Sequence, residues 1–281
     1  MEKFIVNKGQ KLLKSLSYHF PFVGDRVLRA LLKEKNVKVN GKREVENIDV
    51  FPSDTVEIFI PQKYLCLSPD IVFEDDLLLI VNKPANIEVV SPEDDVFTLT
   101  KVLQKRFGEI YPVHRLDTNT TGLVVFAKTQ EALSLLVEAF KLGYITKSYR
   151  AVVYANNLSI HAEFNDYILD TTENIVKVSN KKSKGWLAAR LEYNLIKREA
   201  SLALLNITLH TGRTHQIRAQ LAFHNIFVLG DGKYGDKQAN KIYKAKTQRL
   251  CAHKLVFNFP KGNKLNYLNN KEFCVQPPFD L

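Results

Sequence analysis

Apolar residues at helical and alternating spacings predict a small module at the start of the chain. Four apolar residues share one face of a helix expected from about Asp25 to Lys33: Val27, Leu28, Leu31 and Leu32. Val37 and Val39 then alternate with polar residues and lead into Asn40-Gly41, a pair that tolerates positive φ, so a tight hairpin turn is expected. Three more alternating residues predict a later strand: Val56, Ile58 and Ile60. This α+β module is expected to fill residues 1–62.

A second, larger domain is predicted over residues 71–281. A linker is expected at residues 63–70, because the stretch from Pro61 to Pro69 has prolines and no periodicity. Strands are predicted at residues 71–73, 77–81, 123–127, 187–196 and 202–210, the last two adjacent and antiparallel. Thr129 is expected to cap a helix, and a short helix is expected at residues 216–223. One face of the helix after Thr129 would carry Ala132, Leu133, Leu136, Val137 and Phe140.

Composition and charge indicate a globular protein with a polyanionic partner. The chain is 45% hydrophobic and 25% charged, as is ordinary for a protein with a well-filled core. Its net charge of +10 favours a polyanionic partner of a kind that charge alone does not identify, although a merely solvated basic surface gives the same value. The three cysteines are far apart, so neither a disulfide framework nor a zinc site is expected. With no signal-peptide core and no membrane-length apolar run, a cytoplasmic protein without membrane contact is expected.

A polar segment at residues 113–123 immediately precedes a predicted buried strand. It contains Arg115 and Asp117, and loops on a rigid scaffold commonly carry reactive side chains. Taken alone, an aspartate beside threonine and asparagine fits a turn residue as well as a catalytic carboxylate.

A second polar cluster, at residues 211–218, links a predicted strand to a predicted helix. It concentrates donors suited to phosphate or carboxylate groups, and the planar fork of an arginine can hold a carboxylate in its ionised form. An anion-binding helix start and a simple strand-to-helix turn both remain open from this cluster alone.

Five segments in one order together resemble the RluA-type pseudouridine synthase family over residues 71–260. They are Val81-Asn82-Lys83-Pro84-Ala85, His114-Arg115-Leu116-Asp117, Lys147-Ser148-Tyr149-Arg150-Ala151, the cluster at residues 211–218, and Gly230-Asp231-Gly232-Lys233-Tyr234-Gly235. The resemblance implies an α+β fold, a mixed and mostly antiparallel sheet with flanking helices. It also implies a monomeric enzyme that needs no cofactor or metal and isomerises uridine in structured RNA.

The resemblance assigns a role to each matching residue. Asp117 would attack or stabilise the ribose anomeric centre while the glycosidic bond breaks. Tyr149 would stack on the target base and take part in removing the proton from carbon five, and Arg218 would pair with Asp117. Arg115 would fill the stack vacated by the flipped uridine. Five further residues of these segments are expected to contact RNA: His114, Lys147, Arg213, His215 and Gln216.

Two positions depart from the family pattern. Asn86 stands where a glycine is usual, and asparagine enters the left-handed conformation readily, so the turn is expected to survive. Phe227 replaces a common proline before Gly230-Asp231, which bears on loop rigidity more than on chemistry.

The first module resembles the S-four RNA-binding domain that often precedes this catalytic domain. Its basic residues would contact phosphates without reading sequence: Lys33, Lys35, Lys38, Lys42 and Arg43. Ordinary solvated lysines on a helix and a hairpin are the alternative.

The predicted substrate is large-subunit ribosomal RNA, with transfer RNA as the second candidate. A non-catalytic RNA-binding or ribosome-assembly factor and a hydrolase using His114 or His215 are the other classes considered. The G-x-G-x-x-G match at Gly230 lacks a parallel strand–helix unit around it, so no nucleotide cofactor is expected.

Overall fold

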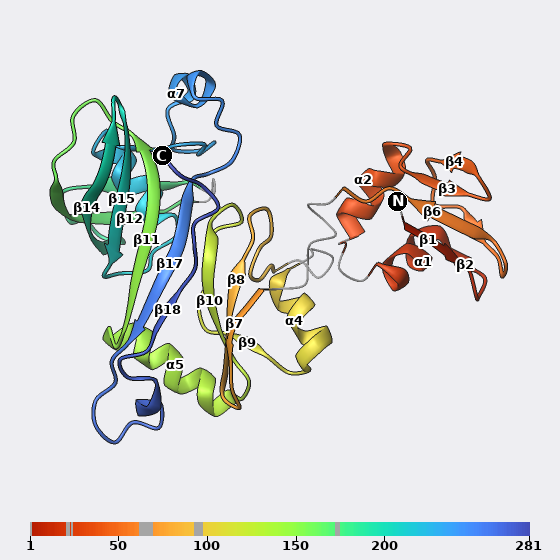
Figure 1. Ribbon diagram of the computed structural model, residues 1–281, viewed down its shortest axis with the longest axis horizontal. Helices are drawn as coiled ribbons and strands as arrows, with labels where there is room; N and C mark the ends of the chain where they lie inside the picture. Colours follow the sequence, from red (N-terminus) through yellow and green to blue (C-terminus); the bar gives the residue numbers. More distant parts are fainter. Residues whose placement is uncertain (1, 21–22, 24, 62–69, 93–97, 172–174) are drawn as a thin grey trace. The chain divides into compact units, whose positions relative to one another are not determined.

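The computed structural model describes residues 2–20, 23, 25–61, 70–92, 98–171 and 175–281, in two compact units (Figure 1). The first unit comprises Met1–Pro69 and Ile87–Ile110, and the second comprises Asp70–Asn86 and Tyr111–Leu281. The linker predicted at residues 63–70 lies, except for Asp70, outside the described residues.

The first unit is a small antiparallel sheet with helices. Its strands are β1 (Glu2–Ile5), β2 (Gln10–Lys11), β3 (Val37–Val39), β4 (Lys42–Glu44), β5 (Asp49–Val50) and β6 (Thr55–Ile58), and its helices are α1 (Leu12–His19), α2 (Asp25–Lys33) and α4 (Leu99–Phe107). Four strands pair in the order β1-β6-β3-β4, and β2 pairs with β5. Helix α2 has the predicted bounds, and Asn40 and Gly41 have φ values of 51° and 81°, which confirms the hairpin turn.

One prediction for this unit was too long by two residues. Strand β6 ends at Ile58, although Ile60 is buried as expected. The N–H of Phe59 donates to the carbonyl of Asn36, outside β3, and Pro61 has no N–H with which to continue a ladder.

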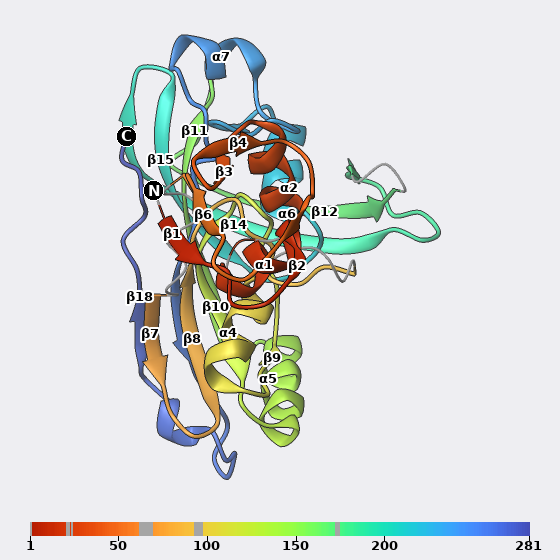
Figure 2. The same cartoon turned by 90° about the vertical axis from the view of Figure 1, so that its right-hand side faces the viewer.

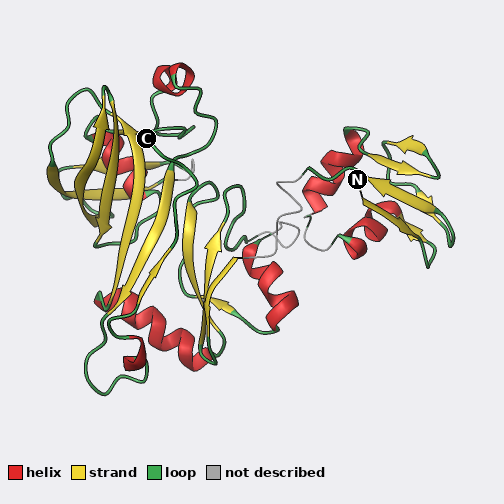
Figure 3. Cartoon of the chain, viewed as in Figure 1, coloured by secondary structure: helices red, strands yellow, loops and turns green. Residues whose placement is uncertain are grey.

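The second unit is built on one large mixed sheet. Its elements are β7 (Asp70–Glu74), β8 (Leu78–Lys83), β9 (Tyr111–Pro112), β10 (Thr121–Ala127), α5 (Gln130–Leu142), β11 (Ile145–Tyr154), β12 (His161–Asp170), β13 (Val176–Ser179), β14 (Leu187–Glu199), β15 (Leu202–Leu209), α6 (Gln216–Phe223), β16 (Phe227–Val228), α7 (Lys237–Ile242), β17 (Leu250–Phe257), the 3₁₀ helix η1 (Asn266–Leu268) and β18 (Glu272–Cys274). The main path is β13-β12-β14-β15-β11-β17-β10-β8-β7. Of these neighbours, β10 and β17 run parallel and the rest antiparallel. The predicted α+β fold is therefore confirmed, and Figure 3 shows how strands dominate this unit.

Helix α5 packs on a buried core formed with β8, β10 and β17. Thr129 caps it, since its side chain accepts a hydrogen bond from the Ala132 N–H, as predicted. Ala132 and Leu136 join the core with Leu123 and Val125. The predicted place of Val137 on the buried face was wrong, because its side chain is 46% exposed. At about 100° per residue, Val137 lies far from the direction shared by the buried residues.

Candidate active site

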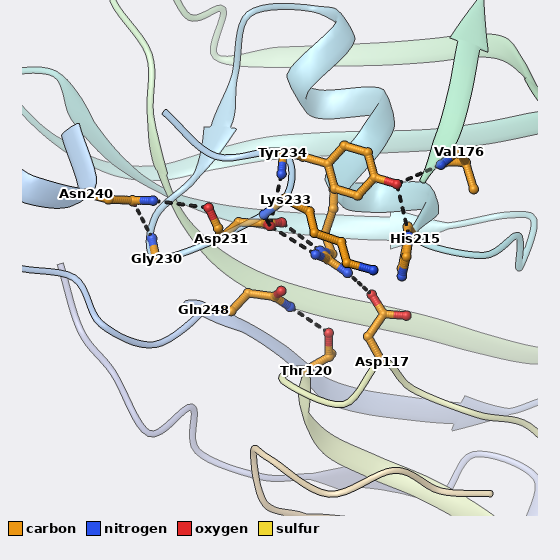
Figure 4. A network of polar contacts seen from close by, with 11 residues as sticks. Asp117, Thr120, Val176, His215, Gly230, Asp231, Lys233, Tyr234, Asn240 and Gln248 are labelled. Atoms are coloured by element: carbon orange, nitrogen blue, oxygen red, sulfur yellow. Dashed lines mark hydrogen bonds and ion pairs between the residues drawn. The ribbon is translucent and has the colours of Figure 1, made fainter. Parts of the chain in front are cut away.

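The loop that carries Asp117 is fixed by buried contacts on both sides. It leads into β10, in which every residue is buried. Lys83 is fully buried, and its Nζ donates to the carbonyls of Pro84 at 2.8 Å and Thr118 at 3.0 Å. The buried amide of Gln248 donates to Thr120 Oγ1 at 2.8 Å (Figure 4). The position of Asp117 is therefore set by residues far from it in sequence.

Arg218 joins two carboxylates that lie far apart in sequence. It stands in the first turn of α6 and is 6% exposed. Its Nη1 donates to Asp117 Oδ2 at 2.7 Å, while its Nε and Nη2 donate to Asp231 Oδ2 and Oδ1 at 2.6 and 2.9 Å. The predicted pair of Arg218 with Asp117 thus forms, and a second carboxylate fixes the guanidinium in two-point geometry.

Asp231 is a buried anion with four donors around it. Its side chain is fully buried, and the N–H groups of Lys233 and Tyr234 also donate to Oδ1, at 2.8 and 3.1 Å. Burial alone would raise the pKa of Asp231, but the Arg218 hydrogen bonds and charge, with the two backbone donors, lower it overall. Burial likewise works against the charge of Arg218, yet the two carboxylates raise its pKa above the ordinary value.

Tyr149 faces the same cavity from β11. The pairing of β11 with β17 shifts register between Ser148 and Tyr149, and such irregularities re-aim side chains. Tyr149 is 6% exposed, and burial, then the charge of Asp117, raises the pKa of its phenol. The phenol is therefore neutral at physiological pH.

A cavity of about 400 Å³ brings the predicted side chains together, and its size falls within the range of small-ligand sites. Asp117, Tyr149 and Arg218 line it, with these predicted RNA contacts: His114, Arg115, Lys147, Arg213, His215 and Gln216. No cluster of three or more His, Cys, Asp or Glu suited to a metal ion occurs among the described residues. No helix in the described part of the chain is long and apolar enough to cross a membrane.

Comparison with known proteins decides the family. A family model described as RNA pseudouridylate synthase matches residues 77–223. The chain belongs to the RNA pseudouridylate synthase family. The resemblance seen in the five segments is confirmed, and the chain is an enzyme of the RNA pseudouridine synthase class.

Relatives match the synthase over nearly its whole length. An uncharacterized RNA pseudouridine synthase of Mycoplasma capricolum is 32% identical over 304 residues, covering 99% of this chain and 98% of the relative. The ribosomal large subunit pseudouridine synthase D of Buchnera aphidicola is 31% identical and covers 90% of this chain and 80% of the relative. The structure of human RNA pseudouridylate synthase domain containing 1 has a TM-score of 0.61 at 22% identity, over 75% of this chain and 84% of that one, which supports the fold.

Sequence reasoning gave no role to Asp231 or Tyr234 of the synthase. Tyr234 Oη lies 3.0 Å from His215 Nδ1 and accepts a hydrogen bond from the Val176 N–H at 2.8 Å, and the Arg218 guanidinium lies 5.1 Å from its ring centroid. The pKa of His215 is lowered, chiefly by burial. The Gly-Asp-x-x-Tyr-Gly segment was the sequence signal that could have identified them. Its aspartate and tyrosine side chains both contact the Arg218 guanidinium.

The residues predicted to contact RNA differ in how far their polar groups are already used in hydrogen bonds within the protein. Arg115 is exposed at the cavity, whereas Gln216 is 3% exposed. The Gln216 amide accepts from Thr211 Oγ1 and Arg213 N and donates to Gln220 Oε1, so it braces its own loop. The role of Gln216 toward RNA stays a prediction. Asn86 has a φ of 65°, so the expected left-handed turn forms there.

The basic residues predicted in the first unit do not share one face of its sheet. Lys38 lies opposite Arg43 in the β3–β4 pairing, while Lys42 lies opposite the core residue Val39 and therefore on the other face. Lys38 and Lys42 also lie 4.0 and 3.9 Å from carboxylates of Glu57 and Glu44. Two more exposed lysines follow at the end of α2: Lys33 and Lys35. Their phosphate contacts remain predictions.

His114 is held by the fold as a neutral ring. Its Nε2 lies 3.1 Å from the Val125 N–H and accepts from it. Burial, then the charge of Lys147, lowers the pKa of His114 to about 3, although a backbone hydrogen bond with Arg115 acts in the opposite direction. A neutral His114 can contact RNA only through hydrogen bonds or stacking, not through charge.

Replacing His114 with glutamine is expected to flatten the loss of stability on acidification. Below its ordinary pKa of 6.5 the unfolded ring takes up a proton that the folded ring refuses, so wild-type stability falls as pH drops from 6.5 toward 3. Glutamine can still accept from Val125 but does not titrate. Urea unfolding at pH 7 and pH 5 measures the difference, with His161→Gln, at an exposed histidine, as control. Equal pH dependence in wild type and His114→Gln would contradict the burial of a neutral ring.

Proposed function

We propose that this synthase isomerises specific uridines to pseudouridine in large-subunit ribosomal RNA, with Asp117 as its catalytic carboxylate. One observation carries the proposal. A carboxylate that is 22% exposed lines a cavity beside the buried ring of Tyr149, and a buried guanidinium holds one of its oxygens at 2.7 Å. Such a group is paired with a cation, held in one orientation and accessible from the cavity, as a reacting carboxylate must be.

The reaction rearranges atoms without adding or removing any. The bond from N1 of the base to C1′ of ribose breaks, the base rotates, and C5 bonds to C1′; a proton leaves C5 and one is taken up at N1. Because substrate and product are isomers, no oxidant, reductant or group donor is required. In this proposal Asp117 acts at C1′, where positive charge develops as the glycosidic bond breaks.

Three other side chains assist in this proposal. Arg218 keeps Asp117 in one orientation, because its Nε and Nη2 atoms both donate to Asp231 and so fix the guanidinium. Tyr149 stacks on the base. Because its phenol is neutral, it takes part in removing the C5 proton by passing its own O–H proton to an acceptor, and not as a phenolate formed beforehand. Arg115, exposed at the cavity, occupies the stack that the flipped uridine leaves.

The choice of ribosomal RNA rests on the relatives and on charge. The relatives from Buchnera aphidicola and Rickettsia felis are named ribosomal large subunit pseudouridine synthases. The net charge of +10 suits a polyanion, and the proposed RNA-binding domain at residues 1–62 would add phosphate contacts. We place the enzyme in the cytoplasm, where bacterial ribosomes assemble.

Tritium release tests the proposal directly. The purified protein is incubated with in-vitro transcripts carrying uridine tritiated at carbon five, one of large-subunit ribosomal RNA and one pool of transfer RNA. Release from the ribosomal transcript is expected, because C5 must lose its hydrogen. Release from transfer RNA alone would overturn the proposal that ribosomal RNA is the substrate. Phosphodiester cleavage would indicate a hydrolase, and RNA binding without tritium release would indicate an RNA-binding or assembly factor.

A further inference from the structure

A lysine-rich segment leaves the active site and returns to it. Between Asp231 and Thr247 the chain exposes five lysines: Lys233, Lys237, Lys241, Lys244 and Lys246. Asp236 is the one acidic residue of residues 232–246, and its carboxylate is used to cap α7 by accepting from the Ala239 N–H at 2.7 Å. We call residues 232–246 the lysine arm. Its exposed side chains thus present positive charge with little local compensation.

Both ends of the lysine arm adjoin residues that are held close to Asp117. At the base, a Cβ on Gly230 would come within 1.9 Å of the Thr247 carbonyl oxygen, so only glycine allows the two ends to approach this closely. The adjoining residues are Asp231, which holds Arg218, and Gln248, which holds Thr120 of the Asp117 loop. The lysine arm therefore starts and ends within two contacts of the proposed catalytic carboxylate.

Helix α7 directs the lysines of the arm toward solvent. Ala239 is 2% exposed, and Asn240 accepts from the Gly230 N–H at 2.7 Å and donates to the Asp231 carbonyl at 3.1 Å. These contacts fix one side of the helix against the turn that Figure 4 shows. Lys237 and Lys241, four residues apart, share the opposite side.

Most of the lysines of the arm have no carboxylate close by among the described residues. In the described part of the chain, no carboxylate lies within ion-pair distance of four of its exposed lysines: Lys237, Lys241, Lys244 and Lys246. Some lysines elsewhere are paired, since Lys128 and Lys254 each lie 2.7 Å from a glutamate oxygen. Like charges four residues apart also destabilise a helix slightly, a cost that binding to a polyanion would remove.

We propose that the lysine arm binds the phosphate backbone of the RNA next to the target uridine, an inference that rests on the proposed function. A cavity of about 400 Å³ holds one nucleotide, so the chain on either side of that nucleotide must cross the surrounding surface. The arm is a fixed positive surface joined to that site. Lysines of this kind position RNA and contribute affinity without reading its sequence.

Salt dependence of RNA binding tests the inference. The variant replaces Lys237, Lys241 and Lys244 with glutamine. The control makes the same change at three exposed lysines of the β17–β18 loop, which both views place at the other end of the second unit: Lys261, Lys264 and Lys271 (Figures 1 and 2). The probe is a fluorescein-labelled in-vitro transcript of a large-subunit ribosomal RNA fragment, and the dissociation constant is measured by anisotropy across potassium chloride concentrations.

Loss of three phosphate contacts is expected to reduce the steepness of the fall of log affinity with log salt by about 2 to 3, at roughly 0.7 to 0.9 per contact. At physiological salt, the dissociation constant should rise about tenfold or more, while the control keeps the wild-type slope. Arginine at the same three positions should restore the slope, because it keeps the charge. An unchanged slope in the glutamine variant, or an equal fall in the control, would overturn the inference.

Tritium release from the same transcript separates this inference from the proposed function. If wild type releases tritium and the glutamine variant keeps its salt slope, the lysine arm is not an RNA contact and the proposed function stands. If no tritium is released but the slope still falls, the arm binds RNA and the proposed function fails.

Discussion

Asparagine at position 117 is expected to abolish pseudouridine formation while RNA binding persists. The substitution keeps the shape of the side chain and an oxygen that can accept from Arg218, but it removes the negative charge proposed to act at C1′. The rate of tritium release under single-turnover conditions should fall by at least about 10³-fold. The dissociation constant for the same RNA should change little, because the Asp117 carboxylate is one charge among the many groups that contact the RNA.

The matched control for this variant is Asp170→Asn. Asp170 is an exposed carboxylate of the same unit and accepts a long hydrogen bond of 3.4 Å from Thr214. Its replacement removes an equal charge and should leave the rate within about twofold of wild type. Turnover by Asp117→Asn at more than a tenth of the wild-type rate would show that another group acts at C1′.

Methionine at position 218 is expected to destabilise the fold most strongly at neutral pH. Removing the guanidinium leaves Asp231 ionised and fully buried without its main partner, which costs about 3–5 kcal/mol. In wild type the pKa of Asp231 lies below its ordinary 3.8, so the ion pair stabilises the fold above about pH 4 and is lost below it. In the variant, only the two backbone donors still oppose the effect of burial, so the protonated acid is favoured more than in wild type and the penalty should shrink as pH falls toward 4.

Urea unfolding of Arg218→Met and wild type at pH 7 and near pH 4.5 measures this effect. Arg213→Met is the control, because Arg213 is exposed and donates through Nε to the Ala188 carbonyl at 3.1 Å. Its loss should cost about 1 kcal/mol or less at both pH values. A loss for Arg218→Met that did not depend on pH would mean that packing, not the charge of Asp231, dominates.

Local patterns were sufficient where local physics decides the structure. Helices α2 and α6 have the predicted bounds, and the Asn40-Gly41 turn forms as its tolerance of positive φ indicates. Helix α1 was missed because it is short and has no side-chain N-cap hydrogen bond. Val137 was placed on the wrong face of α5. The apolar face inferred from the sequence was wider than the part of the helix surface that the neighbouring strands cover.

The site could not be derived from local patterns, because its parts meet only in the folded sheet. Arg218 and Asp117 are 101 residues apart, and no periodicity or spacing brings them together. The pairing was expected because five segments resembled one family, and the structure shows the contact itself. Asp231 was given no role from the sequence, since a buried carboxylate cannot be told from an exposed turn aspartate before its partner is located.

The strand order has a consequence for synthesis of the protein. Strand β17, near the end of the chain, lies between β10, which follows the Asp117 loop, and β11, which carries Tyr149. Those two strands are not neighbours without it, so the nascent polypeptide cannot join its carboxylate to its aromatic ring until residues 250–257 have emerged from the ribosome. Chains released prematurely would hold most of the sequence motifs and yet be catalytically inert.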